Sequence, residues 1–176
     1  MQKHLLLLRA MGSYLFSGAV TGPAYNWAGA VSGSGTDMVK AVKTDGAGNV
    51  YVAGYYAGSN VDFDFSSGST VLSSVNSGLD IFIAKYSSSG QLQWAKSIGG
   101  PGAEEAYDLA LDQSGNIWIT GYFTDTADFN PSAATNKLAA VGYNDIFLAK
   151  YDASGNYLWA GAMGGPDDDF ASAICV

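Results

Sequence analysis

An acidic residue follows each of three tryptophans by ten positions, at Asp37, Glu104 and Asp169. Carboxylates that repeated elements bring to one axis can hold a cation or a basic ligand. The same residues can instead begin a strand from a solvated turn, where their oxygens accept backbone hydrogen bonds. We prefer the turn interpretation and keep a ring of carboxylates, serving binding or catalysis, as its alternative.

Oxygen-bearing side chains also stand at alternate positions in two places, at Asp62 and Asp64 and again at Asp128 and Asn130. A calcium loop opens with this alternation. An EF-hand would continue with glycine at its sixth position and glutamate at its twelfth, where this chain has Ser67 and Ser73. We therefore predict a turn at the end of a strand, with a metal site for calcium as the alternative.

Side chains for acid-base or nucleophilic catalysis are scarce. The single histidine is His4 and the single cysteine is Cys175, so histidine-based catalysis, a Cys/His zinc site and an internal disulfide are excluded. The sequence contains neither a G-x-S-x-G motif nor a Walker loop. We predict no catalytic residue and no cofactor.

The charge balance makes nucleic acid an unexpected partner. The 8 Lys and Arg residues face 16 Asp and Glu residues, which gives a formal net charge of −8. A chain of this charge without a basic stripe repels phosphate backbones.

Residues 1–24 differ from the rest and predict a secretory signal peptide, with a disordered leader as the alternative. Lys3 and Arg9 precede an apolar stretch over residues 10–20, and the small residues Gly22 and Ala24 stand where a cleavage site would lie. No other stretch approaches the roughly 20 apolar residues of a membrane-spanning helix, so no membrane span is predicted.

The remainder is built on a repeat of about 65 residues. Residues 80–100 (DIFIAKYSSSGQLQWAKSIGG) align without gaps with residues 145–165 (DIFLAKYDASGNYLWAGAMGG), and 12 of the 21 positions are identical. GNVYVAGYY from residue 48 likewise matches GNIWITGYF from residue 115. We divide the chain into a partial first unit at 25–79, a second unit at 80–144 and the start of a third at 145–176.

One unit contains four strand-like runs, which in the second unit are Ile81–Tyr86, Leu92–Ile98, Ala106–Leu111 and Asn116–Phe123. Glycines that can take a positive φ close the hairpin turns between them, at Gly48, Gly90, Gly115 and Gly155. Four short antiparallel strands make one propeller blade. We predict an all-β fold of antiparallel four-stranded blades of a β-propeller, with about two blades plus the start of a third.

Between the blades run variable segments rich in Ser, Gly, Ala and Asn, at residues 60–79 and 125–144. Their lengths differ between copies, so we predict surface excursions that would carry any binding specificity.

At these residues the chain resembles the bacterial SBBP repeats, whose units follow a pattern like D-x-F-x-A-K-Y-x-x-x-G-x-x-x-W-A-x-x-x-G-G, then D-x-x-G-N-x-Y-x-x-G-Y and D-F. The matching residues of the second unit are Asp80, Phe82, Ala84, Lys85, Tyr86, Gly90, Trp94, Gly99, Gly100, Asp112, Gly115, Asn116, Gly121, Tyr122, Asp128 and Phe129. The resemblance covers roughly residues 26–176. It implies an exported or cell-surface protein of a Gram-negative, Bacteroidetes-like bacterium, without an assigned activity.

The family strings many repeats together, whereas Cys175 aligns with Ala110, inside the third strand of a unit. A closed propeller typically has four to eight blades. We therefore expect the remaining blades of a longer parent chain, or self-association, to complete this one.

The repeated tryptophans, Trp27, Trp94 and Trp159, are spaced by 67 and 65 residues. Trp94 lies four residues after Gly90 and ten after Ala84, a spacing similar to the tryptophan-docking motif of quinone-dependent dehydrogenase propellers. An indole ring buries a large area and can donate a hydrogen bond. We predict packing between blades, with stacking on a ligand as the alternative.

These features together predict a non-enzymatic, secreted or cell-surface propeller module with a recognition or scaffold role toward a protein or carbohydrate ligand. The alternative is a calcium- or carbohydrate-binding propeller, or a propeller enzyme that uses carboxylates at the channel mouth.

Overall fold

The computed structural model describes residues 27–31 and 33–176, and the predicted signal peptide lies outside these described residues. The first sheet has the order β1 (Asp37–Thr44), β2 (Val50–Ala57), β5 (Leu79–Tyr86) and β6 (Leu92–Ile98). The second sheet has the order β7 (Glu104–Leu111), β8 (Ile117–Phe123), β11 (Asp145–Tyr151) and β12 (Tyr157–Met163). All neighbouring strands are antiparallel.

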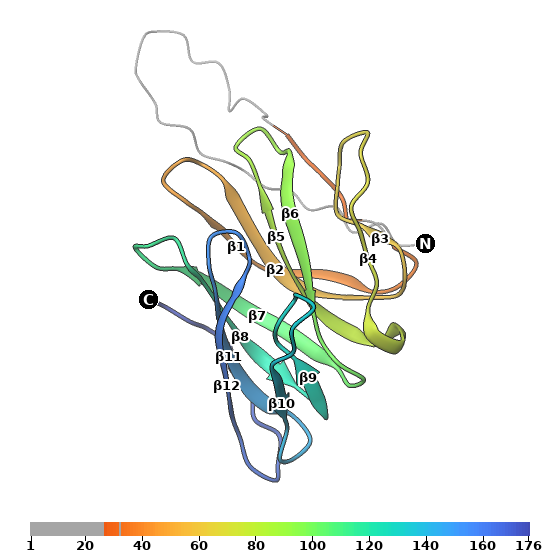
Figure 1. Ribbon diagram of the computed structural model, residues 1–176, viewed down its shortest axis with the longest axis vertical. Coiled ribbons are helices and arrows are strands. Elements are labelled where there is room, and N and C mark those ends of the chain that lie inside the picture. The colour runs from red at the N-terminus through yellow and green to blue at the C-terminus, as the bar shows by residue number, and fades with distance from the viewer. Residues whose placement is uncertain (1–26, 32) are drawn as a thin grey trace, which may run out of the picture.

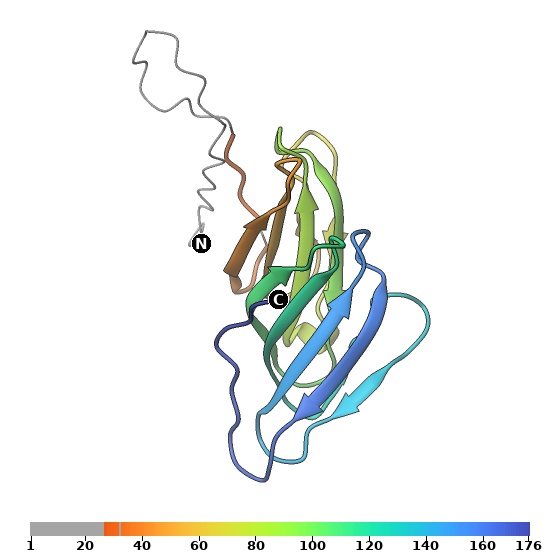
Figure 2. The ribbon, with the colours of Figure 1, turned by 90° about the vertical axis from the view of Figure 1, so that its left-hand side faces the viewer.

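Two short hairpins and one turn of 3-10 helix complete the described part. The hairpins pair β3 (Val61–Asp62) with β4 (Val71–Leu72) and β9 (Thr126–Asp128) with β10 (Lys137–Ala139). The 3-10 turn, η1, spans Val75–Ser77. Figures 1 and 2 show the two large sheets packed beside each other without closing into a ring. The predicted fold class is confirmed: the chain is all-β and consists of four-stranded antiparallel blades of a partial propeller.

Within the described residues, no helix has the length and apolar character that a membrane crossing requires.

The four predicted runs of the second unit correspond to β5, β6, β7 and β8, but the prediction that they form one blade is wrong. β5 pairs along its whole length with β2 of the preceding unit, from Val50 opposite Tyr86 to Ala57 opposite Leu79. β8 pairs instead with β11 of the following unit. The link at residues 99–103 carries the chain from one sheet to the next, and Pro101 within it has no N–H to extend a strand ladder.

Three of the four hairpin turns follow from an Asp-x-x-Gly-Asn sequence, and in the β5–β6 turn Ser87 and Gln91 take its first and last positions. In the β7–β8 turn, the Asp112 carboxylate accepts hydrogen bonds from the backbone N–H groups of Ser114 and Asn116, at 3.0 and 2.9 Å. Gly115 has a φ of 77°, which only glycine adopts at little cost. The other three predicted turn glycines, Gly48, Gly90 and Gly155, also have positive φ values. Local sequence therefore fixes these turns.

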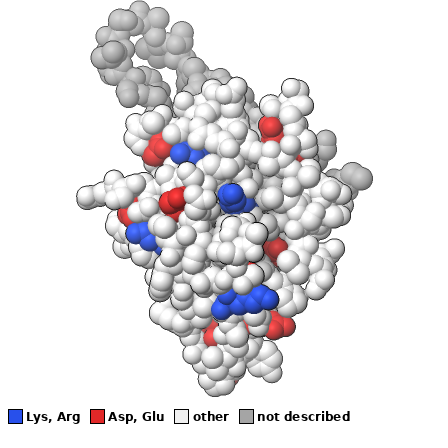
Figure 3. Space-filling model, in the orientation of Figure 1, with Lys and Arg blue, Asp and Glu red and all other residues white. Residues whose placement is uncertain are grey.

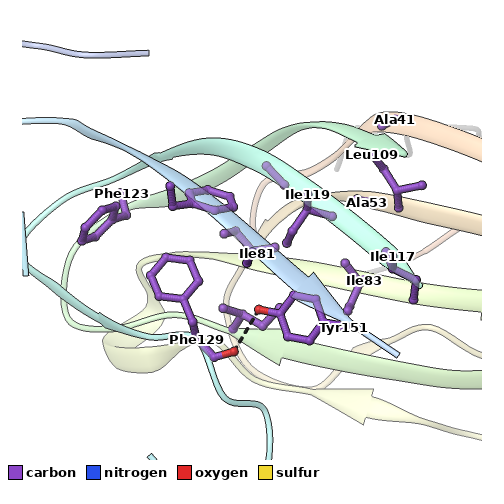
Figure 4. Packing of buried hydrophobic residues seen from close by; sticks show 14 of the residues in the cluster. Ala41, Ala53, Ile81, Ile83, Leu109, Ile117, Ile119, Phe123, Phe129 and Tyr151 are labelled. Atoms are coloured by element: carbon purple, nitrogen blue, oxygen red, sulfur yellow. Dashed lines mark hydrogen bonds between the residues drawn. The ribbon is translucent and has the colours of Figure 1, made fainter. Parts of the chain in front are cut away.

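Two apolar clusters hold the molecule together. The first lies between the sheets, where Ile81 and Ile83 of β5 meet Leu109 of β7 and Ile117 and Ile119 of β8, all at most 1% exposed (Figure 4). The second covers the opposite face of the first sheet. Burial of branched aliphatic side chains at this density is the main favourable contribution to the stability of the fold.

The prediction that residues 60–79 and 125–144 are surface excursions is wrong for the beginning of each segment. Val61 and Phe63 are fully buried in the second cluster, and Ala127 and Phe129 are fully buried in the first. These apolar residues place one hairpin against the edge of each core, because their burial outweighs the polar composition around them.

Candidate functional site

Two of the three predicted carboxylates, Asp37 and Glu104, are the first residues of strands, whereas the third, Asp169, lies outside the strands. Glu104 is the first residue of β7, and its Oε2 accepts a hydrogen bond of 2.9 Å from the Gly100 N–H. In the next unit, Asp169 Oδ2 accepts the equivalent bond of 2.8 Å from the Gly165 N–H. Asp37 is the first residue of β1 and is half-buried. Glu104 and Asp169 thus each bind the Gly-Gly turn that precedes them.

Glu104 is the most unusual of these groups. Its side chain is fully buried, and within the described residues its Oε1 has no hydrogen-bond partner. Burial raises its pKa to about 8; the Gly100 N–H opposes this shift, and the charges of Asp80 and Asp125 add to it.

Asp80 is a second buried carboxyl near Glu104. It accepts hydrogen bonds from the Val75 N–H, at 3.1 Å, and from the Ser97 hydroxyl, at 3.3 Å. Burial raises its pKa to about 6. A Cβ on Gly99 would lie 2.4 Å from its Cγ, so the first glycine of the Gly-Gly pair leaves room for Asp80 while the second binds Glu104.

In the part of the chain that the structure describes, no three His, Cys, Asp or Glu side chains lie close enough together to hold a metal ion. The alternating side-chain oxygens at Asp62 and Asp64 accept hydrogen bonds from backbone N–H groups. Asp62 Oδ1 accepts the N–H of Asp64 at 3.0 Å, and Asp64 Oδ1 accepts the N–H of Ser66 at 2.9 Å.

The second copy repeats this geometry at Asp128 and Asn130. Asp128 Oδ1 accepts the Asn130 N–H at 3.0 Å, and Asn130 Oδ1 accepts the Ser132 N–H at 3.1 Å. Each side chain therefore closes a turn over the residue two positions ahead, which is the usual role of Asp and Asn in loops.

The Phe between these turn residues points into the core. Phe129 is fully buried, and its carbonyl oxygen accepts a 2.9 Å hydrogen bond from the hydroxyl of Tyr151 (Figure 4). Phe63 and Tyr86 make the same bond, also at 2.9 Å, in the preceding unit. The Asp-Phe and Ala-Lys-Tyr motifs of the repeat are therefore parts of one structural contact.

The tryptophans pack against the turn glycine of the following unit. The Trp27 ring lies over Gly90, where a Cβ would approach it to 2.7 Å, and its Nε1 donates to the Ser88 carbonyl at 3.1 Å. The Trp94 ring lies over Gly155, where a Cβ would approach it to 3.1 Å. Trp159 is 47% exposed and contacts Trp118 of its own sheet.

We expect Trp94→Ala to lower the free energy of unfolding by about 2 kcal/mol, because it removes a half-buried ring that packs against the core between the sheets. Trp159→Ala should cost less than about 1 kcal/mol, because that ring is much more exposed. Urea unfolding at low protein concentration measures both values. Equal losses in the two variants would contradict a packing role for Trp94.

Sequence reasoning missed a polar hollow between the two blades. It has a volume of about 210 Å³ and lies among β6, the β9–β10 loop and the β11–β12 turn, with Lys96, Pro131 and Tyr157 in its lining. The hollow could have been found by aligning the repeats, because Pro131 aligns with Phe65 of the preceding unit and Lys96 aligns with Gly29.

Charged side chains do not gather by sign on the face of the molecule that Figure 3 shows. Acidic and basic groups are interspersed there among uncharged residues. Recognition by a strongly charged patch is therefore not indicated on this face.

No family model matches the chain, and membership of the SBBP family is not shown. The chain is similar to an uncharacterized WD repeat-containing protein of Acanthamoeba polyphaga mimivirus, with 28% identity over 173 residues, and to Regulatory protein FlaEY of Caulobacter vibrioides, with 26% identity over 95 residues. The matches cover 83% and 54% of this chain but only 12% and 10% of those relatives. The WD repeat relative and the two four-stranded sheets together support a repeat protein of β-propeller-like fold.

Proposed function

We propose that this chain is a non-enzymatic propeller module whose uncovered sheet face binds a further blade of the same repeat, in a secreted or cell-surface scaffold. The leader pattern at residues 1–24 supports export, and the resemblance to SBBP repeats supports a bacterial surface location. Apolar residues of β12 that are exposed, although their equivalents on the first sheet are covered, support the proposal.

On the first sheet, the face that meets the second sheet includes Ile98 of β6 at 1% exposure, beside the half-buried Trp94. The equivalent residues of the second sheet are Met163 and Trp159 of β12, which are 55% and 47% exposed. The same apolar pattern is thus covered in one sheet and open in the next. Clustered exposed apolar side chains of this kind mark an interaction surface.

The partner of this face is another four-stranded sheet, because a four-stranded sheet covers the equivalent face of the first sheet. Strand pairing is not required for this contact, since the sheets pack face against face. The partner sheet can come from a longer chain, as in the much longer relatives, or from a second copy of this one.

Light scattering on the full chain, with and without calcium, tests the proposal. We expect a mass above that of the monomer, which Trp159→Lys together with Met163→Lys returns to the monomer value because two buried lysines would be unpaired in the interface. Val71→Lys is the control, since Val71 lies on β4, outside the sheet face, and is 50% exposed.

A strictly monomeric wild-type chain would contradict self-association. A loss of association only after calcium removal would instead favour the calcium-binding alternative.

A further inference from the structure

The hollow between the blades is formed by both sheets of one chain and does not include the open face of β12. Its lining comprises Gly155 and six side chains: Lys96, Asn130, Pro131, Ser132, Asn156 and Tyr157. The site is therefore independent of the blade-binding surface proposed above, and each can fail without the other.

In the first unit, a phenylalanine fills the corresponding space. The Phe65 ring stacks on Tyr86, with 4.7 Å between ring centroids and 8° between planes, and it lies so close to Gly29 that a Cβ there would overlap it. Pro131 replaces Phe65 in the second unit and is too small to reach the same volume. The hollow left open has a volume of about 210 Å³, which is enough for one six-membered sugar ring.

The groups around this space are polar, in contrast to the apolar contacts of Phe65. Turn hydrogen bonds already occupy the acceptor atoms of two of them, because Asn130 Oδ1 accepts the Ser132 N–H and Ser132 Oγ accepts the Ala134 N–H. The Asn130 amide and the Ser132 hydroxyl keep their donor hydrogens. Asn156 differs, because its amide already donates to Asp152 at 2.8 Å. The donors of the lining therefore come from Lys96, Asn130 and Ser132.

Lys96 is the one ionised group in the lining. Its aliphatic stem packs at Gly155, where a Cβ would lie 3.2 Å from its Cγ. Its ammonium makes no salt bridge within the described residues, and the carboxylate on which its charge acts is that of Asp152 in the β11–β12 turn. Tyr157 supplies an aromatic ring and belongs to the residues packed against the core between the sheets. A carboxylate is the group that best complements an ammonium surrounded by further donors.

We propose that this hollow binds the pyranose ring of a uronic acid. The ring takes the volume that Phe65 fills in the first unit, and its carboxylate meets Lys96. Its hydroxyl groups accept hydrogen bonds from Asn130 and Ser132, while the C–H face of the sugar lies against Tyr157 or Pro131.

Calorimetric titration of the full chain with glucuronate tests the site. We expect a dissociation constant on the order of 1 mM, because a half-open hollow contacts only one ring. Glucose should bind at least about fivefold more weakly, since it lacks the carboxylate, and acetate should bind weaker still, since it lacks the ring. Acetate binding as tightly as glucuronate, or no glucuronate binding at about 50 mM, would overturn the proposal.

Two substitutions locate the binding. Pro131→Phe restores the side chain of the first unit and should weaken glucuronate binding by at least about tenfold, because the ring space is filled. Lys96→Gln should remove the preference for glucuronate over glucose. The control, Lys137→Gln, removes an exposed lysine of β10 outside the lining and should leave affinity unchanged.

Thermal unfolding of Pro131→Phe shows whether that variant folds, and Lys96→Gln tests the site even if it does not. Unchanged affinity in Lys96→Gln would overturn the assignment of the carboxylate to this hollow.

Discussion

Replacing Gly121 with alanine is expected to lower the free energy of unfolding by about 3 kcal/mol or more, because the added methyl group meets a fixed backbone carbonyl. A Cβ on Gly121 would lie 1.9 Å from the carbonyl oxygen of Glu105. The neighbouring strand is bulged at this point, where the register shifts between Ala106 and Asp108. Moving that carbonyl would disturb the β7–β8 ladder on both sides of the bulge.

Gly46→Ala is the matched control, because a Cβ on Gly46 would meet no atom within 4 Å. Its free energy of unfolding should stay within about 1 kcal/mol of the wild type. Chemical denaturation followed by tryptophan fluorescence measures both variants. A Gly121→Ala protein as stable as Gly46→Ala would show that the bulge can open at little cost, and would refute this account of the repeated glycine.

The second large effect concerns the buried carboxyl of Glu104. Burial raises its pKa in the folded protein to about 8, from an ordinary value of 4.5. The neutral form is therefore favoured by folding. The stability that this neutral form contributes is fully present below pH 4.5 and is lost as the pH rises from 4.5 through 8. The difference of 3.5 between the two pKa values corresponds to on the order of 5 kcal/mol. Asp80, whose pKa is raised to about 6, adds a loss over a lower range of pH.

We expect Glu104→Gln to be more stable than the wild type at pH 8 by on the order of 2 kcal/mol, and close to it at pH 5. The gain is smaller than the full ionisation cost because the new amide group would have unpaired N–H donors. Urea titrations at the two pH values give the comparison.

Asp167→Asn, at an exposed carboxylate, is the control and should show the same pH dependence as the wild type. A Glu104→Gln protein less stable than the wild type at pH 8 would mean that Glu104 is ionised and stabilised in the folded state.

Several elements could be predicted from sequence because their causes are local. The turn at Asp112 depends on a carboxylate reaching backbone N–H groups two and four residues ahead and on a glycine at positive φ, and all of these lie within five residues. Alternation of apolar residues gave the strands for the same reason. The lengths of the four strands predicted in the second unit followed within one or two residues, since the turns bound them.

The candidate site was less predictable, since side chains from different units form it. Asp62 and Asp128 have the spacing of calcium ligands, but whether their oxygens bind a cation or a backbone N–H depends on the path of the following residues. The burial of Glu104 likewise depends on β5 and residues 99–103 closing around it, which no local pattern encodes.

The sequence by itself determined the repeat, the antiparallel strands, the hairpin turns and the all-β fold, because each depends on residues close together in the chain. Only the tertiary structure decided that β5 pairs with β2 while β8 pairs with β11, since pairing between units depends on which apolar faces can be buried together. The tertiary structure also decided that Trp94 is half-buried while Trp159 is exposed. It decided as well that a hollow remains beside Pro131, whereas the Phe65 ring fills the corresponding space in the first unit. Aligned residues of a repeat thus acquire different roles because their neighbours in space differ.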